Sequence, residues 1–304
     1  MNIVAVQLDS VWEDPLANFA KVKRMLAAQP PEDGSLIVLP EMFATGFSMD
    51  VSKTMHGDSR GTENFLRTLA LRHRCTVTGG VVNPGAGGLG RNESVTFAAD
   101  GTLLARYVKQ QPFSGAGEDK VHEAGNEAVV FRLGEFTAAP LICYDLRFPE
   151  RFRAAARLGA DLFIEIAAWP VKRIEHWLTL LRARAIENLA FVIGVNRTDS
   201  EPRFEYCGRS VVVNPHGEII ADAGTAETIL NAQILHADVA AWRAEFPALR
   251  DAHGRRSERW RCRKEPGHPR PEADIRGGGA PAPCFRAIPP AVACPSSRGR
   301  RTRR

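Results

Sequence analysis

Residues 138–164, AAPLICYDLRFPERFRAAARLGADLFI, hold two apolar runs with a charged turn and a helical pattern between them. Each apolar run is typical of a strand buried on both faces, and Pro149 suits the first turn of a helix. This alternation predicts an α/β domain. One thiol, Cys143, lies where the first strand is expected to end. A structural cysteine would normally lie inside the run, so this position asks for a chemical reason.

The same alternation continues over residues 1–253. Runs rich in β-branched residues predict strands, and apolar residues at helical spacing predict helices. The expected strands are 2–6, 35–40, 75–82, 93–98, 102–109, 139–143, 160–169, 190–196 and 227–234, with a hairpin at 209–220; the expected helices are 15–28, 62–74, 174–189 and one following Pro149. Together they predict a three-layer or sandwich-type α/β domain, residues 1–253, whose last ordered piece is 242–253.

The character of the chain changes at Gly254. Residues 254–304 are dense in Pro, Gly and Arg without sustained periodicity, so we expect a disordered tail. The tail holds 14 Lys and Arg against 4 Asp and Glu; because the whole chain carries +5, residues 1–253 carry −5. A basic arm could bind nucleic acid, but the acidic body and the lack of a recognisable binding fold argue against that partner. We expect a solvated extension, whether functional or accidental.

Cysteine usage and hydropathy exclude several classes of protein. The six cysteines form no CxxC pair and have no His cluster at zinc-finger spacing, so we expect neither a metal site nor a disulfide framework. No apolar stretch reaches the roughly 20 residues that a membrane span needs. The first residues, MNIVAVQLDSVWEDP, lack the pattern of a secretory signal. We therefore expect a cytoplasmic protein without a membrane partner.

Three reactive side chains each follow an expected strand: Glu41, Lys109 and Cys143. Ligands of α/β sheets gather at the carboxyl ends of strands, so these groups could meet there. A thiol with an ordinary pKa near 8.5 needs a base or a nearby positive charge in order to react. A carboxylate could accept its proton, and an ammonium could stabilise the thiolate or an oxyanion. Each residue alone would pass for a surface carboxylate, a solvated lysine or an inert thiol.

The flanking sequence is more specific. The blocks LIVLPEMFATGFS, KQQPFSGAGE, LICYDLRFPE, AAWPVKR and RARAIENLAFVIGVNR follow one another along the chain. In this order they resemble the motif blocks of the nitrilase (carbon–nitrogen hydrolase) superfamily, and most of all its omega-amidase branch, which acts on 2-oxoglutaramate. The resemblance spans about residues 3–252, and the cysteine block is its most specific part.

The resemblance assigns a role to each matching residue. Glu41 matches the general base, Lys109 the catalytic lysine and Cys143 the nucleophile. Glu118 matches a second glutamate that helps to orient the site. The backbone N–H of Tyr144 would complete an oxyanion hole with the lysine. No metal and no organic cofactor is required for such a reaction.

The family fold implied is a four-layer α-β-β-α sandwich, commonly paired into homodimers. It explains why Cys143 lies at the exit of its strand, since the thiol must meet a substrate there. Asp145, Arg147 and Glu150 are then expected to anchor the turn rather than to react.

The resemblance implies a small substrate that carries a carboxylate remote from its amide, so a cation is needed in the pocket. Arg173, in WPVKR, matches a position where this branch often has an arginine. Phe47, Phe113 and Trp169 could wall a small pocket, although as aromatics they could equally belong to the core. The chain departs from the branch at Ala168, where asparagine is usual.

The implied function is a cysteine-dependent amidase that hydrolyses the terminal amide of small ω-amidated oxo acids, such as 2-oxoglutaramate, through a thioester. The same chemistry would serve an N-carbamoyl amino acid amidohydrolase, an aliphatic amidase or a nitrilase. The sequence leaves the physiological amide open among these.

Overall fold

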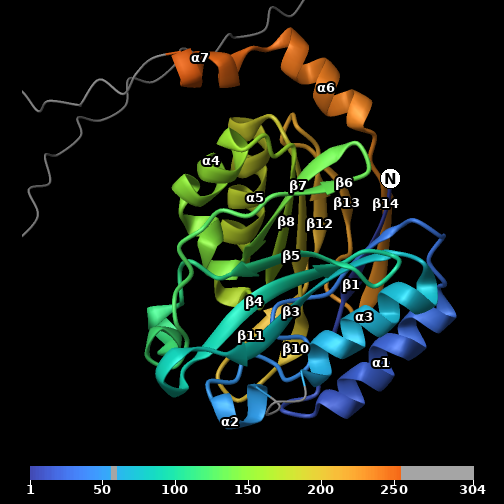
Figure 1. The fold of residues 1–304 in the computed structure, drawn as a ribbon, viewed down its shortest axis with the longest axis vertical. Helices are drawn as coiled ribbons and strands as arrows, with labels where there is room; N and C mark the ends of the chain where they lie inside the picture. The colour runs from blue at the N-terminus through green and yellow to red at the C-terminus, as the bar shows by residue number, and fades with distance from the viewer. Residues whose placement is uncertain (56–59, 255–304) are drawn as a thin grey trace, which may run out of the picture. The chain divides into compact units, whose positions relative to one another are not determined.

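The computed structural model describes residues 1–55 and 60–254. Two six-stranded sheets form the centre of this part of the chain, and Figure 1 labels most of their strands. The first sheet has the order β14-β1-β2-β3-β4-β5, with strands Thr228–Gln233, Asn2–Gln7, Leu36–Val38, Thr76–Pro84, Gly90–Phe97 and Leu103–Val108. The second has the order β13-β12-β9-β8-β7-β6, with strands Ile219–Asp222, Val211–Val213, Phe191–Asn196, Leu162–Ala167, Phe136–Ile142 and Phe131–Leu133.

Each sheet combines parallel and antiparallel pairs. In the first sheet β1, β2 and β3 are parallel, and β4, β5 and β14 add antiparallel edges. In the second sheet β7, β8 and β9 are parallel, and β6, β12 and β13 are antiparallel. The parallel strands β8 and β9 are buried throughout and β1 is buried beyond Asn2, as their continuous apolar sequence predicts.

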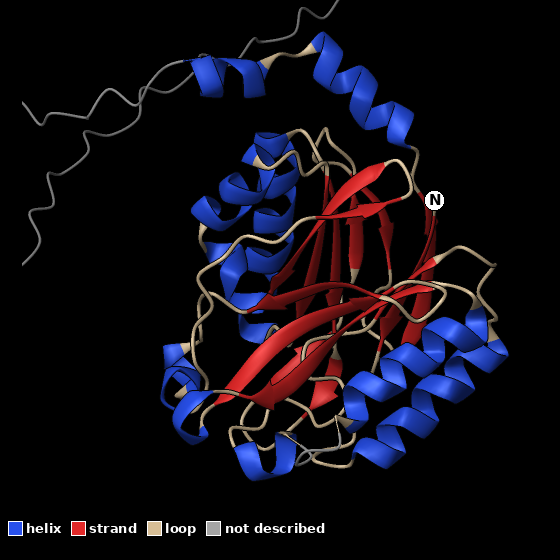
Figure 2. Cartoon of the chain, viewed as in Figure 1, coloured by secondary structure: helices blue, strands red, loops and turns tan. Residues whose placement is uncertain are grey.

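Helices cover the outer face of each sheet, as Figure 2 shows. α1 (Pro15–Ala28) and α3 (Gly61–His73) pack their apolar sides into the core cluster of the first sheet. α4 (Pro149–Arg157) and α5 (Ile174–Asn188) do the same for the second sheet. Residues of both sheets share a single core cluster between them, so the four layers are α-β-β-α and the expected sandwich is confirmed.

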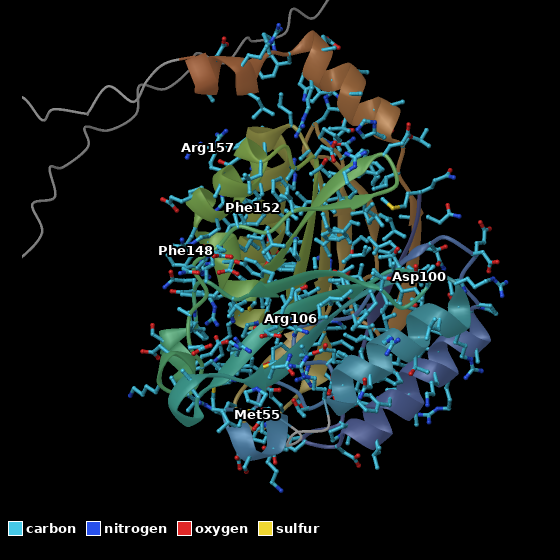
Figure 3. All side chains as sticks on the ribbon, viewed as in Figure 1. Met55, Asp100, Arg106, Phe148, Phe152 and Arg157 are labelled. Carbon is cyan, nitrogen blue, oxygen red and sulfur yellow. The ribbon has the colours of Figure 1, made fainter. Side chains whose placement is uncertain are left out.

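Local chemistry explains where these helices begin. The side chain of Asp14 accepts a hydrogen bond from the backbone N–H of Ala17, and Pro15 occupies the first helical position of α1. Pro149 begins α4 in the same way. Phe152 then points from α4 into the core and is fully buried, whereas Arg106 lies on β5 of the other sheet (Figure 3).

The remaining elements lie around the two sheets. They are the helices α2 (Val51–Thr54), α6 (His236–Glu245) and α7 (Ala248–Gly254), and a separate hairpin of β10 (Thr198–Ser200) and β11 (Glu205–Cys207). The sequence did not predict this hairpin, because its short polar strands lack a β-branched run. The expected disordered tail, apart from Gly254, lies outside the described residues. No helix in the described part of the chain combines the length and apolarity needed to cross a membrane.

Candidate active site

Glu41 and Cys143 are brought together by the ends of strands from different sheets. Glu41 follows β2, and Gly80 on β3 makes room for it: a side chain at Gly80 would approach the Glu41 Cα to 2.7 Å and the Met42 nitrogen to 2.4 Å. Cys143 follows β7 and begins a 3-10 turn with φ +48°, a left-handed conformation that a residue other than glycine rarely adopts. Such strained positions cluster at functional sites.

Lys109 lies between two carboxylates. Its Nζ donates to Glu41 Oε1 and to Glu118 Oε2, both at 2.8 Å. The three side chains are at most 1 % exposed. Burial alone would lower the pKa of Lys109, but the charges of Glu118 and Glu41 outweigh it and raise that pKa well above its usual value. The lysine is therefore an ammonium.

Backbone and amide donors hold the carboxylates in place. Asn92 Nδ2 donates to Glu41 Oε1 at 2.7 Å and to Glu118 Oε1 at 2.8 Å. The backbone N–H of Ala168 donates to Glu41 Oε2 at 2.8 Å, and that of Phe113 to Glu118 Oε2 at 2.6 Å. Glu118 is buried, which would raise its pKa, but Lys109 and these donors lower it. The group thus holds two ordered carboxylates around one ammonium.

The thiol of Cys143 adjoins this group. Its Sγ lies 3.8 Å from the carbonyl oxygen of Ala168. Burial, followed by the negative charge of Glu41, raises the pKa of the thiol well above its usual value, and Lys109 only partly opposes this. The resting thiol is therefore protonated, and it needs a base at the moment of reaction.

A cavity opens in front of the thiol. Its lining residues are Phe47, Phe113, Cys143, Tyr144, Arg147, Ala168, Trp169, Pro170, Arg173 and Phe204. It therefore includes all four residues that were expected to bind substrate. Of Glu41, Lys109 and Cys143, only Cys143 lines the cavity. Glu41 and Lys109 are buried, and Lys109 Nζ lies 5.4 Å from the ring centre of Phe47, which is a lining residue.

Two arginines face this cavity. The guanidinium of Arg147 lies 4.9 Å from the ring centre of Trp169, and that of Arg173 lies 5.3 Å from the ring centre of Phe113. Burial and then the charge of Arg173 lower the pKa of Arg147. Among the described residues, neither arginine forms an ion pair with a carboxylate.

The turn after Cys143 corrects one expectation. Asp145 does anchor it, because its carboxylate accepts from Tyr107 Oη at 2.8 Å, from the Gln111 N–H at 2.9 Å and from the Ile142 N–H at 3.2 Å. Arg147, however, lines the cavity rather than anchoring the turn, because the 3-10 geometry turns its side chain toward Trp169.

Phe148 and Glu150 lie further along the same segment. Glu150 is an exposed residue in the first turn of α4. Phe148, labelled in Figure 3, ends the 3-10 turn and packs edge-on against Tyr144. No three His, Cys, Asp or Glu side chains of residues 1–55 and 60–254 are grouped so that they could hold a metal ion.

Sequence reasoning missed Asn92, Arg147, Phe204 and the backbone groups of Ala168. A signal for Asn92 was present in the sequence: Asn92, Ser94 and Thr96 alternate along β4, so their polar side chains share one face of the strand. The Ala168 N–H carries no such signal, since it lies 127 positions from its partner Glu41.

The sequence of the chain is similar to those of known proteins. The sequence model of the carbon–nitrogen hydrolase family matches residues 2–244. The chain is 31 % identical over 250 residues to the 2-oxoglutaramate amidase of Bacillus subtilis, covering 82 % of this chain and 96 % of that one. It is 36 % identical over 254 residues to omega-amidase YafV of Yersinia enterocolitica, covering 83 % and 96 %.

Solved structures agree with these sequence relatives. A carbon–nitrogen hydrolase superfamily protein of Xanthomonas campestris, with an arsenic adduct in its active site, has a TM-score of 0.77 at 32 % identity and covers 83 % of this chain and 96 % of that one. Saccharomyces cerevisiae Nit3, from branch 10 of the nitrilase superfamily, has a TM-score of 0.72 at 27 % identity, covering 81 % and 94 %. The chain therefore belongs to the carbon–nitrogen hydrolase family of the nitrilase superfamily.

Proposed function

We propose that the chain is a cysteine-dependent amidase that hydrolyses the terminal amide of small ω-amidated oxo acids, such as 2-oxoglutaramate, to the acid and ammonia. One observation carries this proposal: a single cavity holds a thiol beside the Glu41–Lys109 pair and two arginines that no described carboxylate pairs. The first arrangement suits attack on an amide carbon, and the second suits a carboxylate on the same molecule. Relatives named 2-oxoglutaramate amidase and omega-amidase support this substrate class.

The first half of the proposed reaction forms a thioester. Glu41 takes the proton of the Cys143 thiol as sulfur bonds to the amide carbon. The raised pKa of the thiol makes this base necessary. The ammonium of Lys109 and the backbone N–H of Tyr144 stabilise the oxyanion that develops on the amide oxygen. Glu41 then passes its proton to the nitrogen, the C–N bond breaks, and ammonia leaves.

The second half releases the acid. Glu41 removes a proton from a water molecule, whose oxygen attacks the thioester carbon. The C–S bond breaks as Glu41 returns the proton to sulfur, so the enzyme recovers its starting state. Glu118 and Asn92 take no proton in this cycle; they hold the lysine and the base in position.

The nucleophile is tested by measuring ammonia release from 2-oxoglutaramate in Cys143→Ala and Cys143→Ser. Both variants are expected to lose turnover, because neither alanine nor the far less acidic hydroxyl can replace the thiol. Cys75→Ala is the matched control, since Cys75 is also a buried free thiol but lies in the outer core of the first sheet. Wild-type turnover in Cys143→Ala would exclude the mechanism.

The substrate is tested by replacing each arginine with methionine. Arg147→Met and Arg173→Met are expected to raise KM for 2-oxoglutaramate about 10-fold or more, because each removes a charged partner of the carboxylate. Turnover of an uncharged amide of the same length should change little. A panel of N-carbamoyl amino acids, aliphatic amides and nitriles shows whether another substrate gives a higher kcat/KM than 2-oxoglutaramate.

Three further properties belong to this proposal. Residues 1–253 are expected to form the catalytic domain and residues 254–304 a dispensable tail. We also expect a homodimer, which light scattering would measure, and a cytoplasmic location, which cell fractionation would measure.

A further inference from the structure

One buried carboxylate outside the catalytic group fastens the walls of the cavity. Glu201 follows β10, and its side chain is 1 % exposed. Its Oε2 accepts from the backbone N–H of Phe47 at 3.1 Å and from the guanidinium of Arg197, and its Oε1 accepts from the hydroxyl of Tyr206. The donors come from three segments: the loop after Glu41, the residue that follows β9, and β11.

The loop after Glu41 and the turn between β10 and β11 carry two aromatic rings that pack against each other and form one wall of the cavity. Phe47 and Phe204 both line it, with ring centres 6.4 Å apart. The backbone N–H of Glu201 donates to the carbonyl oxygen of Phe204 at 2.9 Å and so closes the turn of the hairpin. Tyr206 is in turn bridged to Pro170, another lining residue. Through Glu201, the backbone of Phe47 is therefore tied to the hairpin that holds Phe204.

Gly46 gives an independent sign that this junction is built tightly. Its φ is +74°, and a Cβ there would lie 3.0 Å from Arg197 Nη1 and 3.2 Å from Glu201 Oε2. Only glycine lets the loop approach the ion pair at that conformation. Burial and then the charge of Glu201 raise the pKa of Tyr206, which therefore keeps its hydroxyl proton and remains a donor.

We propose that Glu201 is a positioning residue that holds the packed rings of Phe47 and Phe204 at one wall of the cavity and thereby sets the length of amide substrate that the cavity accepts. The proposal rests on the proposed function, since it assigns the substrate chain to the space that this wall bounds. The side chain of Glu201 bonds to Phe47, Arg197 and Tyr206 rather than to the thiol or the Glu41–Lys109 pair, so its effect is expected on selectivity more than on the chemical step.

The test uses the full chain and three monoamides of increasing length: succinamate, glutaramate and adipamate, with four, five and six carbons. Glu201→Ala removes the acceptor of the Phe47 N–H, whereas Glu201→Gln keeps an oxygen for that N–H and an amide for the Tyr206 hydroxyl. Both variants leave Arg197 without its charged partner and are expected to lose thermal stability, Glu201→Ala more than Glu201→Gln because it also loses the hydrogen bonds. Glutamine is therefore the matched control for the lost charge.

We expect wild type to prefer one chain length, and the ratio of kcat/KM between that amide and the next longer one to fall about 10-fold in Glu201→Ala, mostly through KM. Glu201→Gln should keep the ratio within about 3-fold. A ratio that is unchanged in Glu201→Ala, or equal in the two variants, would show a merely structural residue. Equal rates for all three amides in wild type would also overturn the inference.

A second variant covers the case in which Glu201→Ala does not fold. Tyr206→Phe removes a single hydroxyl from the junction and is expected to lower the same ratio about 3-fold, the effect of one hydrogen bond. An unchanged ratio there refutes the inference. Absence of ammonia release in wild type from these amides and from 2-oxoglutaramate would instead refute the proposed function, so the two failures are distinguishable.

Discussion

Glu165 is a buried residue whose replacement is predicted to stabilise the protein, whereas most substitutions destabilise. It lies in the middle of β8, between Leu141 and Gly194 of the adjacent strands, and is fully buried. Neither oxygen of its carboxyl group has a hydrogen-bond partner among the described residues. Burial, followed by the charges of Asp145 and Glu41, raises the pKa of this carboxyl well above its usual value. Glu165 is therefore a neutral acid whose polar atoms are unsatisfied.

Replacing Glu165 with methionine should stabilise the protein. Methionine is unbranched, similar in length and free of strongly polar atoms. Relief of an unsatisfied buried polar group contributes about 1–3 kcal/mol to the free energy of unfolding. For a domain of this size each kcal/mol shifts Tm by roughly 2–4 °C, so a rise of about 2–12 °C is expected by calorimetry.

The pH dependence adds a second readout. Because the pKa of Glu165 is raised in the folded state above the usual 4.5, folding favours the protonated form. The part of wild-type stability that depends on Glu165 is therefore greatest below pH 4.5, where Glu165 is protonated in both states, and it falls as pH rises toward the pKa of Glu165 in the folded state. Methionine does not titrate, so the advantage of Glu165→Met over wild type should widen between pH 5 and pH 8.

Glu93 supplies the control, because it is also fully buried but accepts from Asn83 at 2.7 Å and from the guanidinium of Arg106. Glu93→Met should destabilise by about 1–3 kcal/mol, since it removes an acceptor of Asn83 and leaves Arg106 with Glu63 as its remaining carboxylate partner. A loss of stability in Glu165→Met, or an advantage that does not change with pH, would refute the reasoning.

Three other predictions concern the site and the tail. Lys109→Met leaves Glu41 and Glu118 buried without a counter-charge, so it should destabilise by about 3–5 kcal/mol and abolish ammonia release; adding Glu118→Gln should recover part of Tm but no activity. Asp145→Asn should lower kcat, because an amide cannot accept from all three donors of the turn. Burial raises the pKa of Asp145 to about 7, so the free energy of unfolding of wild type falls as pH rises from 4 to 7. Asparagine does not titrate, so the difference in free energy of unfolding between wild type and Asp145→Asn, measured in urea titrations, should narrow over that range. Deletion of residues 254–304 should leave Tm and turnover unchanged.

The sequence identified the parts of the site that carry local signals. Strand and helix periodicity located β2, β5 and β7, and the residues that follow them are Glu41, Lys109 and Cys143. Residues alone left three-layer and sandwich arrangements open, and the motif blocks selected the four-layer form.

The partners of these residues could not be predicted in the same way. The Ala168 N–H and its acceptor Glu41 are 127 positions apart, and Glu201 and its donor, the Phe47 N–H, are 154 positions apart. Which of these groups meet depends on how the two sheets pack. From sequence, Arg147 was grouped with Asp145 as an anchor of the turn, and only the 3-10 geometry shows that their side chains point in different directions. Side-chain direction within an irregular turn has no periodic signature.

The proposed machinery is divided between the two halves of the sandwich. Glu41 and Lys109 follow strands of the first sheet, and Cys143 and Ala168 follow strands of the second, so the distance from sulfur to base depends on the shared core and on hydrogen bonds between the halves, such as that from the Ala168 N–H to Glu41. A small displacement of one half relative to the other would separate these atoms, while the strands of each sheet kept their hydrogen bonds to one another. Catalysis should therefore disappear in mild denaturant before circular dichroism records any loss of strands or helices.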